Sequence, residues 1–160
     1  MNELVTIADG ACKRGQHCGA GVLLVNPENG SIIEEHAKYT GEGTNNYSEY
    51  KAVLFAIEKA EEYAREKDIR KITILTDSAL IVEQLNGVFK IKQRNLKPLH
   101  EEVTEEIERL RNEGWNIIID QVSREYTLRA DEIASEEALK AMSTSTEKKY
   151  PFLSALKKED

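Results

Sequence analysis

The sequence predicts an α/β protein built on a five-stranded mixed sheet, with helices on both faces of the sheet. Near the N-terminus, three apolar runs rich in β-branched residues are separated by turn sequences, which is typical of an antiparallel three-strand meander. Further along, stretches with helical spacing of apolar residues alternate with two more β-type runs. Because a helix precedes each of these two later strands, they should run parallel to the first.

The individual elements are predicted in chain order from these patterns. The N-terminal strands are expected over residues 4–8, 20–25 and 31–39, with residues 26–30 (NPENG) as the turn between the last two. Apolar side chains then recur at helical spacing from Ala52 to Tyr63, which predicts a helix over about residues 44–67. The same patterns predict strands over residues 71–76 and 115–121, and helices over residues 78–85, 96–112 and 124–142.

The length of the chain limits its domain organisation. A chain of 160 residues, 40% of them hydrophobic, can bury one core but is too short for two ordinary domains. We therefore expect a single domain over residues 1–142 and a tail over residues 143–160, where periodicity is lost apart from an apolar patch at residues 150–156 (YPFLSAL). The tail is either a linker with a docking segment or a flap over the domain.

Composition excludes several classes of protein. No run approaches the roughly 20 apolar residues of a membrane span, and the first residues (MNELVTI) do not resemble a signal peptide. We expect a soluble, cytoplasmic monomer that does not contact a membrane. The net charge of −7 argues against coating nucleic acid through bulk positive charge, so any nucleic-acid-binding face must be local.

The chain has two cysteines, Cys12 and Cys18. Two are too few for a disulfide scaffold, and their spacing lacks the second ligand pair of a zinc site. We expect both to be reduced thiols.

Four acidic residues lie where folding alone explains an acid poorly. Asp9 and Asp77 end the first and fourth predicted strands, and the carboxyl ends of parallel strands form the functional crevice of an open α/β sheet. Glu49 lies in the first turns of its helix, and Asp131 lies on the packed side of the last helix. Four carboxylates that converge on one crevice require a neutralising cation.

Carboxylates without nearby histidine or cysteine ligands favour Mg²⁺ or Mn²⁺ over zinc. Two such ions about 4 Å apart are the usual solution for in-line attack on a phosphodiester. The acids therefore indicate metal-dependent phosphodiester hydrolysis. Taken singly, each acid has a structural alternative; Asp77 and Ser78, for example, precede a helix and fit a turn or helix cap.

The pattern as a whole resembles the type 1 ribonuclease H family. The resemblance covers roughly residues 3–140 and rests on four motifs in the family's order: ADG at 8–10, TNNYSEY at 44–50, LTDS at 75–78 and RADEIA at 129–134. It implies a ribonuclease H-like catalytic domain that cleaves the RNA strand of RNA/DNA hybrids and leaves 3′-hydroxyl and 5′-phosphate ends. It also implies that two metal ions are held by the four catalytic acids, Asp9, Glu49, Asp77 and Asp131.

The resemblance also implies which side chains touch the hybrid. Asn45 and Asn46 match residues that reach the minor groove, where 2′-hydroxyl groups distinguish RNA from DNA. Thr44 matches a phosphate-pocket residue on the DNA strand. For all three the alternative is a helix cap, although two adjacent amides exceed what a cap requires. Gly10 and Ser78, beside two of the acids, complete this part of the expected binding surface.

Two features of the family are missing from the sequence. The basic protrusion of well-studied bacterial members is absent, and a shorter basic segment within residues 86–97 stands in its position. It either binds the DNA backbone or is a solvated loop, and its expected contacts are Phe89, Lys90, Lys92 and Arg94. In place of a histidine-bearing loop the chain has residues 123–129 (SREYTLR), where Arg124 is expected to contact phosphate.

Three other functions compete with this one. A different nuclease on the same fold, acting on duplex RNA or structured DNA, is possible because fold does not fix substrate. Asn45 and Asn46 argue against a DNA-only enzyme, whereas nothing excludes duplex RNA. A non-catalytic hybrid-binding module would not need all four acids. A partner-binding domain that docks through residues 150–156 would make the acids coincidental.

Overall fold

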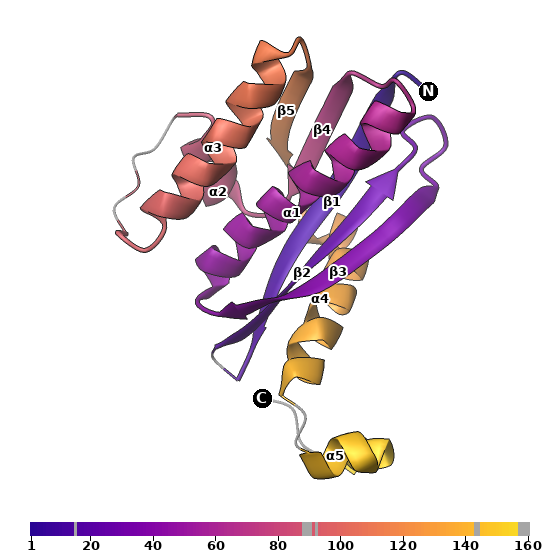
Figure 1. Ribbon diagram of the computed structural model, residues 1–160, viewed down its shortest axis with the longest axis vertical. Coiled ribbons are helices and arrows are strands. Elements are labelled where there is room, and N and C mark those ends of the chain that lie inside the picture. The colour runs from indigo at the N-terminus through magenta and orange to yellow at the C-terminus, as the bar shows by residue number, and fades with distance from the viewer. Residues whose placement is uncertain (15, 88–90, 92, 143–144, 157–160) are drawn as a thin grey trace.

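The structure, a computed structural model, describes residues 1–14, 16–87, 91, 93–142 and 145–156 (Figure 1). The sheet has the order β3-β2-β1-β4-β5. The β1–β2 and β2–β3 pairs are antiparallel, and the β1–β4 and β4–β5 pairs are parallel. The predicted mixed sheet is thus confirmed, and its strands are β1 (Glu3–Lys13), β2 (His17–Val25), β3 (Ile32–Glu42), β4 (Lys71–Thr76) and β5 (Asn116–Gln121).

Helices cover both faces of the sheet, as predicted. On one face α1 packs on the central strands with α3 beside it, and α4 lies across the opposite face (Figure 1). The helices of the domain are α1 (Asn45–Glu66), α2 (Ala79–Leu85), α3 (Lys97–Asn112) and α4 (Leu128–Ala141).

The main core lies between the sheet and the layer of α1 and α3. Alternate residues of the strands, such as Leu4, Leu24 and Ile74, are fully buried against this layer. Because successive strand residues point to opposite faces, Leu23 instead packs under α4 in a smaller cluster with Ile133. Burying one such side chain contributes about 1.5–3 kcal/mol, so the main core fixes the position of α1 firmly.

Glycines in β2 allow α4 to approach the sheet closely. A Cβ atom at Gly21 would lie 2.1 Å from the carbonyl oxygen of Ala130, and one at Gly19 would lie 2.1 Å from that of Ala134. Real Cβ atoms do not approach backbone oxygens this closely. The backbone of α4 therefore rests directly on β2, which fixes the height of Asp131 above the sheet.

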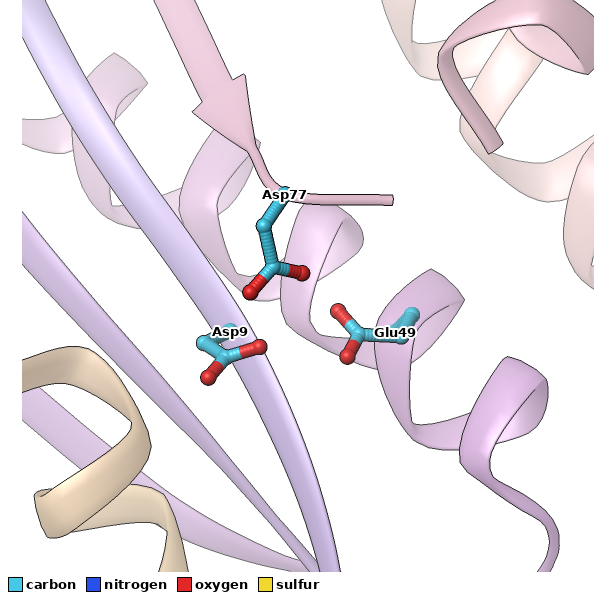
Figure 2. A group of neighbouring side chains, drawn as sticks. All are labelled: Asp9, Glu49 and Asp77. Atoms are coloured by element: carbon cyan, nitrogen blue, oxygen red, sulfur yellow. The ribbon is translucent and has the colours of Figure 1, made fainter. Parts of the chain in front are cut away.

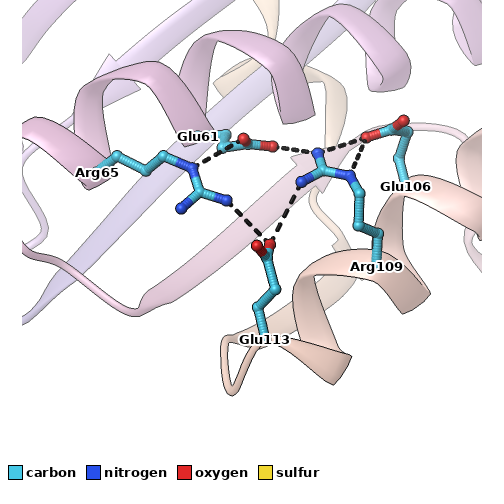
Figure 3. A network of polar contacts seen from close by, with 5 residues as sticks. All are labelled: Glu61, Arg65, Glu106, Arg109 and Glu113. Atoms are coloured by element: carbon cyan, nitrogen blue, oxygen red, sulfur yellow. Dashed lines mark hydrogen bonds and ion pairs between the residues drawn. The ribbon is translucent and has the colours of Figure 1, made fainter.

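An exposed ion-pair network joins α1 to α3 (Figure 3). Arg65 of α1 bonds Glu61 and Glu113, each at 2.9 Å, and Arg109 of α3 bonds Glu61 and Glu106. Exposed pairs of this kind contribute about 0–1 kcal/mol each, so the network supplements the buried contacts between the two helices.

The first strand is longer than predicted and continues past Asp9 to Lys13. Asp9 therefore lies inside β1 and not at its end. The parallel pairing with β4 nevertheless stops at Ile7 and Leu75, and the two aspartates, Asp9 and Asp77, each follow two residues later. They lie where β1 and β4 separate, so the expected crevice is present although its position along β1 is different.

The last helix begins later than predicted. Residues Arg124–Tyr126 form a single 3₁₀ turn, η1, and α4 starts at Leu128. The backbone N–H groups of Tyr126 and Thr127 donate to carbonyls three residues earlier, so this stretch is wound more tightly than an α-helix.

The expectation of reduced cysteines is wrong. Cys12 and Cys18 form a disulfide across the β1–β2 hairpin. They are direct partners in the antiparallel register, with Cα atoms 4.0 Å apart. Their spacing in the sequence does not reveal this register, because it depends on the turn that joins the strands.

The described part of the tail contains two short helical segments, α5 (Ser145–Lys149) and η2 (Pro151–Leu156). They contact each other, and α5 lies beyond the end of α4, away from the sheet (Figure 1). No helix within the described ranges has both the length and the apolar composition that crossing a bilayer requires.

We predict that Gly21→Ala weakens both the fold and the acidic site, because the new Cβ must displace α4 and with it Asp131. Overpacking of this kind costs roughly 1–3 kcal/mol, measurable by urea denaturation. Gly30→Ala is the control, because a Cβ at Gly30 meets open space and only its φ of +73° is strained. Gly30→Ala should leave Mg²⁺ affinity unchanged in a calorimetric titration, whereas Gly21→Ala should lower it. Wild-type Mg²⁺ affinity and stability in Gly21→Ala would contradict the close approach of α4.

Candidate active site

Three of the four predicted acids meet in the crevice where β1 and β4 separate. Asp9 comes from β1, Glu49 from α1 and Asp77 from the end of β4, and their carboxyl groups point toward one another (Figure 2). Each offers one oxygen, and these oxygens all lie within 4.8 Å of one another.

Gly10 brings Glu49 to the strand. A Cβ at Gly10 would lie 2.4 Å from the backbone of Ser48, so only glycine lets β1 and the start of α1 come this close. The Gly10 N–H then donates to Glu49 Oε2 at 3.3 Å. Gly10 therefore contacts Glu49 in the structure, and its contact with substrate stays a prediction.

Asp77 is fixed by a residue whose role the sequence did not reveal. Thr127 is fully buried, and its hydroxyl lies 2.8 Å from Asp77 Oδ2. The carbonyl of Thr127 accepts the N–H of Asp131 at 2.8 Å, so this threonine joins two of the predicted acids. The only signal in the sequence was its position four residues before Asp131, which is insufficient to assign such a role.

Burial and mutual repulsion strongly perturb the carboxyl groups of Asp9 and Glu49. Asp9 is fully buried, and its Oδ1 has no hydrogen-bond partner among the described residues. Burial, and then the nearby charges of Glu49 and Asp77, raise the pKa of Asp9 well above its usual range. Burial also raises the pKa of Glu49. The fully ionised site would therefore hold more negative charge than its own hydrogen bonds can stabilise.

The guanidinium of Arg124 lies among these acids and partly neutralises them. Its Nη1 is 3.0 Å from Asp77 and 3.4 Å from Asp9, and its Nη2 is 3.3 Å from Asp131. Asp131 thus joins the cluster through Arg124, since the group with oxygens within 4.8 Å contains only the other three acids. Arg124 was predicted to contact phosphate, and here it contacts the carboxylates.

The donor set fits a hard divalent cation. The three carboxylates offer convergent oxygens, and Asp9 also has a buried oxygen without a partner among the described residues. The raised pKa of Asp9 and of Glu49 reflects charge that a cation would stabilise. Oxygen-only ligands of this kind suit Mg²⁺ or Mn²⁺.

The segment expected to read the hybrid lies at the start of α1. Thr44 caps the helix by accepting the N–H of Tyr47 at 3.2 Å. This confirms the helix cap that was the alternative to a phosphate contact. Asn45 is exposed and Asn46 half-buried, and neither side-chain amide makes a hydrogen bond within the described part of the chain. Because Thr44 supplies the cap, both amides remain available to a ligand. Ser78 likewise caps α2, by accepting from Ile81 N–H.

Most of the expected basic contacts cannot be placed. Phe89, Lys90 and Lys92 lie outside the described residues. Arg94 is exposed in the turn before α3. Their binding to the DNA strand stays a prediction.

We predict that Asp9→Asn stabilises the metal-free protein. A carboxyl whose pKa is higher in the folded state keeps its proton where the unfolded chain has lost it, so the free energy of unfolding falls as pH rises above the unfolded pKa of about 4. The variant lacks this loss and should exceed wild type by on the order of 1–3 kcal/mol at pH 8, the usual cost of an unpartnered buried group.

Urea denaturation in EDTA at pH 5, 6.5 and 8 measures this difference, which should widen with pH. Mg²⁺ should stabilise wild type more than Asp9→Asn, because ligand binding to the folded state adds to stability. A difference that does not change with pH would show that Asp9 does not carry the raised pKa.

Comparisons with known sequences identify related proteins. The profile of the family described as "Reverse transcriptase-like" matches residues 8–137. Among curated proteins, "Bifunctional protein Rv2228c" of Mycobacterium tuberculosis is 26% identical over 99 residues, or 61% of this chain. The match spans about a quarter of the length of that relative.

Similar solved structures cover more of the chain than this curated protein does. LC11-RNase H1, isolated from compost by a metagenomic approach, is 32% identical with a TM-score of 0.78, covering 89% of this chain and 100% of that one. RNase H1 from the halophilic archaeon Halobacterium salinarum is 26% identical with a TM-score of 0.71, covering 84% of this chain and 96% of that one. The three acids shown in Figure 2 agree with these similarities. The chain belongs to the reverse transcriptase-like family and, within it, to the type 1 ribonucleases H.

Proposed function

We propose that this protein is an endonuclease that hydrolyses the RNA strand of RNA/DNA hybrids and leaves 3′-hydroxyl and 5′-phosphate ends. The observation that carries the proposal is the convergence of Asp9, Glu49 and Asp77, with an unpartnered buried oxygen on Asp9. A similar protein, LC11-RNase H1, has been solved in complex with an RNA/DNA hybrid; it is 29% identical, with a TM-score of 0.76.

The acids would hold two Mg²⁺ or Mn²⁺ ions through Asp9, Glu49, Asp77 and Asp131. When bound, such ions supply an activated water and neutralise the charge on the leaving oxygen. The chain's own contribution is to keep the carboxylates fixed before substrate arrives: Gly10 holds Glu49, and Thr127 holds Asp77. Fixed ligands cost little reorganisation during the reaction.

Arg124 has the chemistry to bind the scissile phosphate. Its guanidinium offers several donors in a planar fork that matches phosphate oxygens, and its side chain is 58% exposed beside the acids. With the carboxylates neutralised by bound cations, the Arg124 fork would be free to donate to the substrate. Arg124 would then contact phosphate from the segment that stands in place of the family's histidine-bearing loop.

The start of α1 would select the substrate. The free amides of Asn45 and Asn46 suit the minor groove, where 2′-hydroxyl groups both donate and accept hydrogen bonds. The Thr44 hydroxyl, exposed at the helix N-terminus, suits a phosphate of the DNA strand. All of these residues fall within residues 1–142, which we propose as the catalytic unit, with residues 143–160 as an appendage.

The decisive assay uses end-labelled RNA/DNA hybrid, duplex RNA and duplex DNA, each with Mg²⁺, Mn²⁺ or EDTA. Wild type should cut the RNA of the hybrid only when metal is present, and cleavage of duplex RNA would add a second substrate.

Asp77→Asn should lower the rate by more than about 100-fold, the upper range for residues that merely support a metal ligand. Asp120→Asn is the matched control, because Asp120 is an exposed carboxylate on the neighbouring strand β5. If no substrate is cleaved in a metal-dependent way, the proposed activity is wrong, and a non-catalytic binding module is the remaining interpretation.

We predict opposite effects of Arg124→Ala on metal and on substrate. Removing the guanidinium removes a competing cation, so Mg²⁺ should bind the free protein more tightly in a calorimetric titration. Cleavage should fall, because the phosphate loses its partner; a lost charged hydrogen bond costs about 1.5–3 kcal/mol, or roughly 10- to 150-fold.

Arg129→Ala is the control for charge alone, since Arg129 lies at the start of the following helix, α4, but pairs with Glu35 and Glu132. It should change neither quantity. Weaker Mg²⁺ binding in Arg124→Ala would contradict the competition.

A further inference from the structure

We propose that the Cys12–Cys18 disulfide is a positioning crosslink for substrate binding, because it braces the backbone that carries Thr44, Asn45 and Asn46. This inference rests on the proposed function, since it assigns a purpose to the segment that would read the hybrid.

The disulfide touches the connection between β3 and α1 directly. Cys12 Sγ lies 3.3 Å from the carbonyl oxygen of Thr44, and Cys18 Sγ lies 3.4 Å from that of Gly43. The neighbouring turn adds one hydrogen bond, from Gly43 N–H to the carbonyl of Gln16 at 2.8 Å. The end of the β1–β2 hairpin is therefore a platform on which residues 43 and 44 rest.

This connection needs bracing because its backbone is intrinsically loose. It contains Gly43, which packs against the Tyr47 ring where a Cβ would lie 2.2 Å from a ring carbon, and it follows Gly41 near the end of β3, whose φ is +97°. Glycine loses more conformational freedom on ordering than any other residue. Apart from the hairpin, its main described support is Tyr47, whose hydroxyl donates to the carbonyl of Thr40 at 3.1 Å.

The platform itself lies at the weak end of a hairpin. Beyond the Cys12–Cys18 pair only one register pair, Lys13 with His17, separates the disulfide from the turn. The pairing of β2 with β3 is also irregular here, with a register shift between Cys18 and Gly19. A covalent link at this position prevents fraying that the remaining hydrogen bonds oppose only weakly.

The catalytic acids have separate supports. Asp9 lies opposite Gly21 in the continuous part of the β1–β2 ladder, and Glu49 is held by Gly10. The loop closed by the disulfide is short, with a sequence separation of 6, so its effect on the unfolded chain is smaller than that of a long loop. Opening the disulfide should therefore weaken hybrid binding and leave the chemical step intact.

The experiment compares the oxidised protein with the dithiothreitol-treated protein and with Cys12→Ser/Cys18→Ser. Dithiothreitol passes two electrons and two protons to the disulfide, giving two thiols, and becomes a cyclic disulfide itself. Opening the bond should raise KM for the hybrid by about 3- to 10-fold, with kcat changed less than about twofold, the signature of lost uniform binding. Dithiothreitol should not affect the double-serine variant.

Two readouts do not depend on cleavage. Amide hydrogen exchange at Gly43 and Thr44 in the free protein should accelerate when the disulfide opens, whereas exchange near Asp9 should not. Equilibrium binding of fluorescent hybrid in EDTA should weaken in parallel with KM. Cys12→Val/Cys18→Val retains apolar packing without the bond, and it should behave like the reduced protein.

Two free thiols in the oxidised protein, or equal KM and equal exchange in both states, would overturn the inference. So would a fall in kcat at constant KM, since this places the effect on the acids. If the oxidised protein binds hybrid but cuts nothing, the proposed function fails, while the exchange and binding arms still decide this inference.

Discussion

The repulsion between carboxylates gathered at one point of the sheet is the constraint on which the rest of the structure depends. Asp9, Glu49 and Asp77 would separate if each side chain were free to turn toward water. Burial and the like charges of the neighbouring acids raise the pKa of Asp9 and Glu49, so the fully ionised site is unfavourable without a cation. Each is instead delivered by a different element that is fixed elsewhere. Arg124 reduces the repulsion, which lets the acidic site exist before metal binds.

Two kinds of packing hold these elements against that repulsion. On one face, the apolar core fixes α1, and the contact at Gly10 then places Glu49 within reach of the strand. On the other, Gly19 and Gly21 let α4 rest on β2, which places Asp131 beside Arg124. The exposed ion-pair network of Figure 3 adds to the contact between α1 and α3, but water and salt screen the attraction between its charges.

Element order and strand directions could be predicted because periodicity is a local property of the sequence. The acids could be recognised because four motifs occur in one order. Register could not be predicted: the pairing of Cys12 with Cys18, and the extension of β1 past Asp9, depend on how strands align. The contacts of Arg124 and Thr127 with Asp77 were equally inaccessible, because they join residues that are 47 and 50 positions apart along the chain.

The seating of α4 on the β2 glycines also determines when during synthesis the nuclease can become active. β1 and β2 leave the ribosome early, but the helix that covers one of their faces and carries Asp131 is the last element of the sheet domain to emerge. A nascent chain that ends before η1 has β2 uncovered on that face and an acidic crevice without Arg124, Thr127 or Asp131. Truncated translation products that lack η1 and α4 should therefore be inert toward the RNA/DNA hybrid.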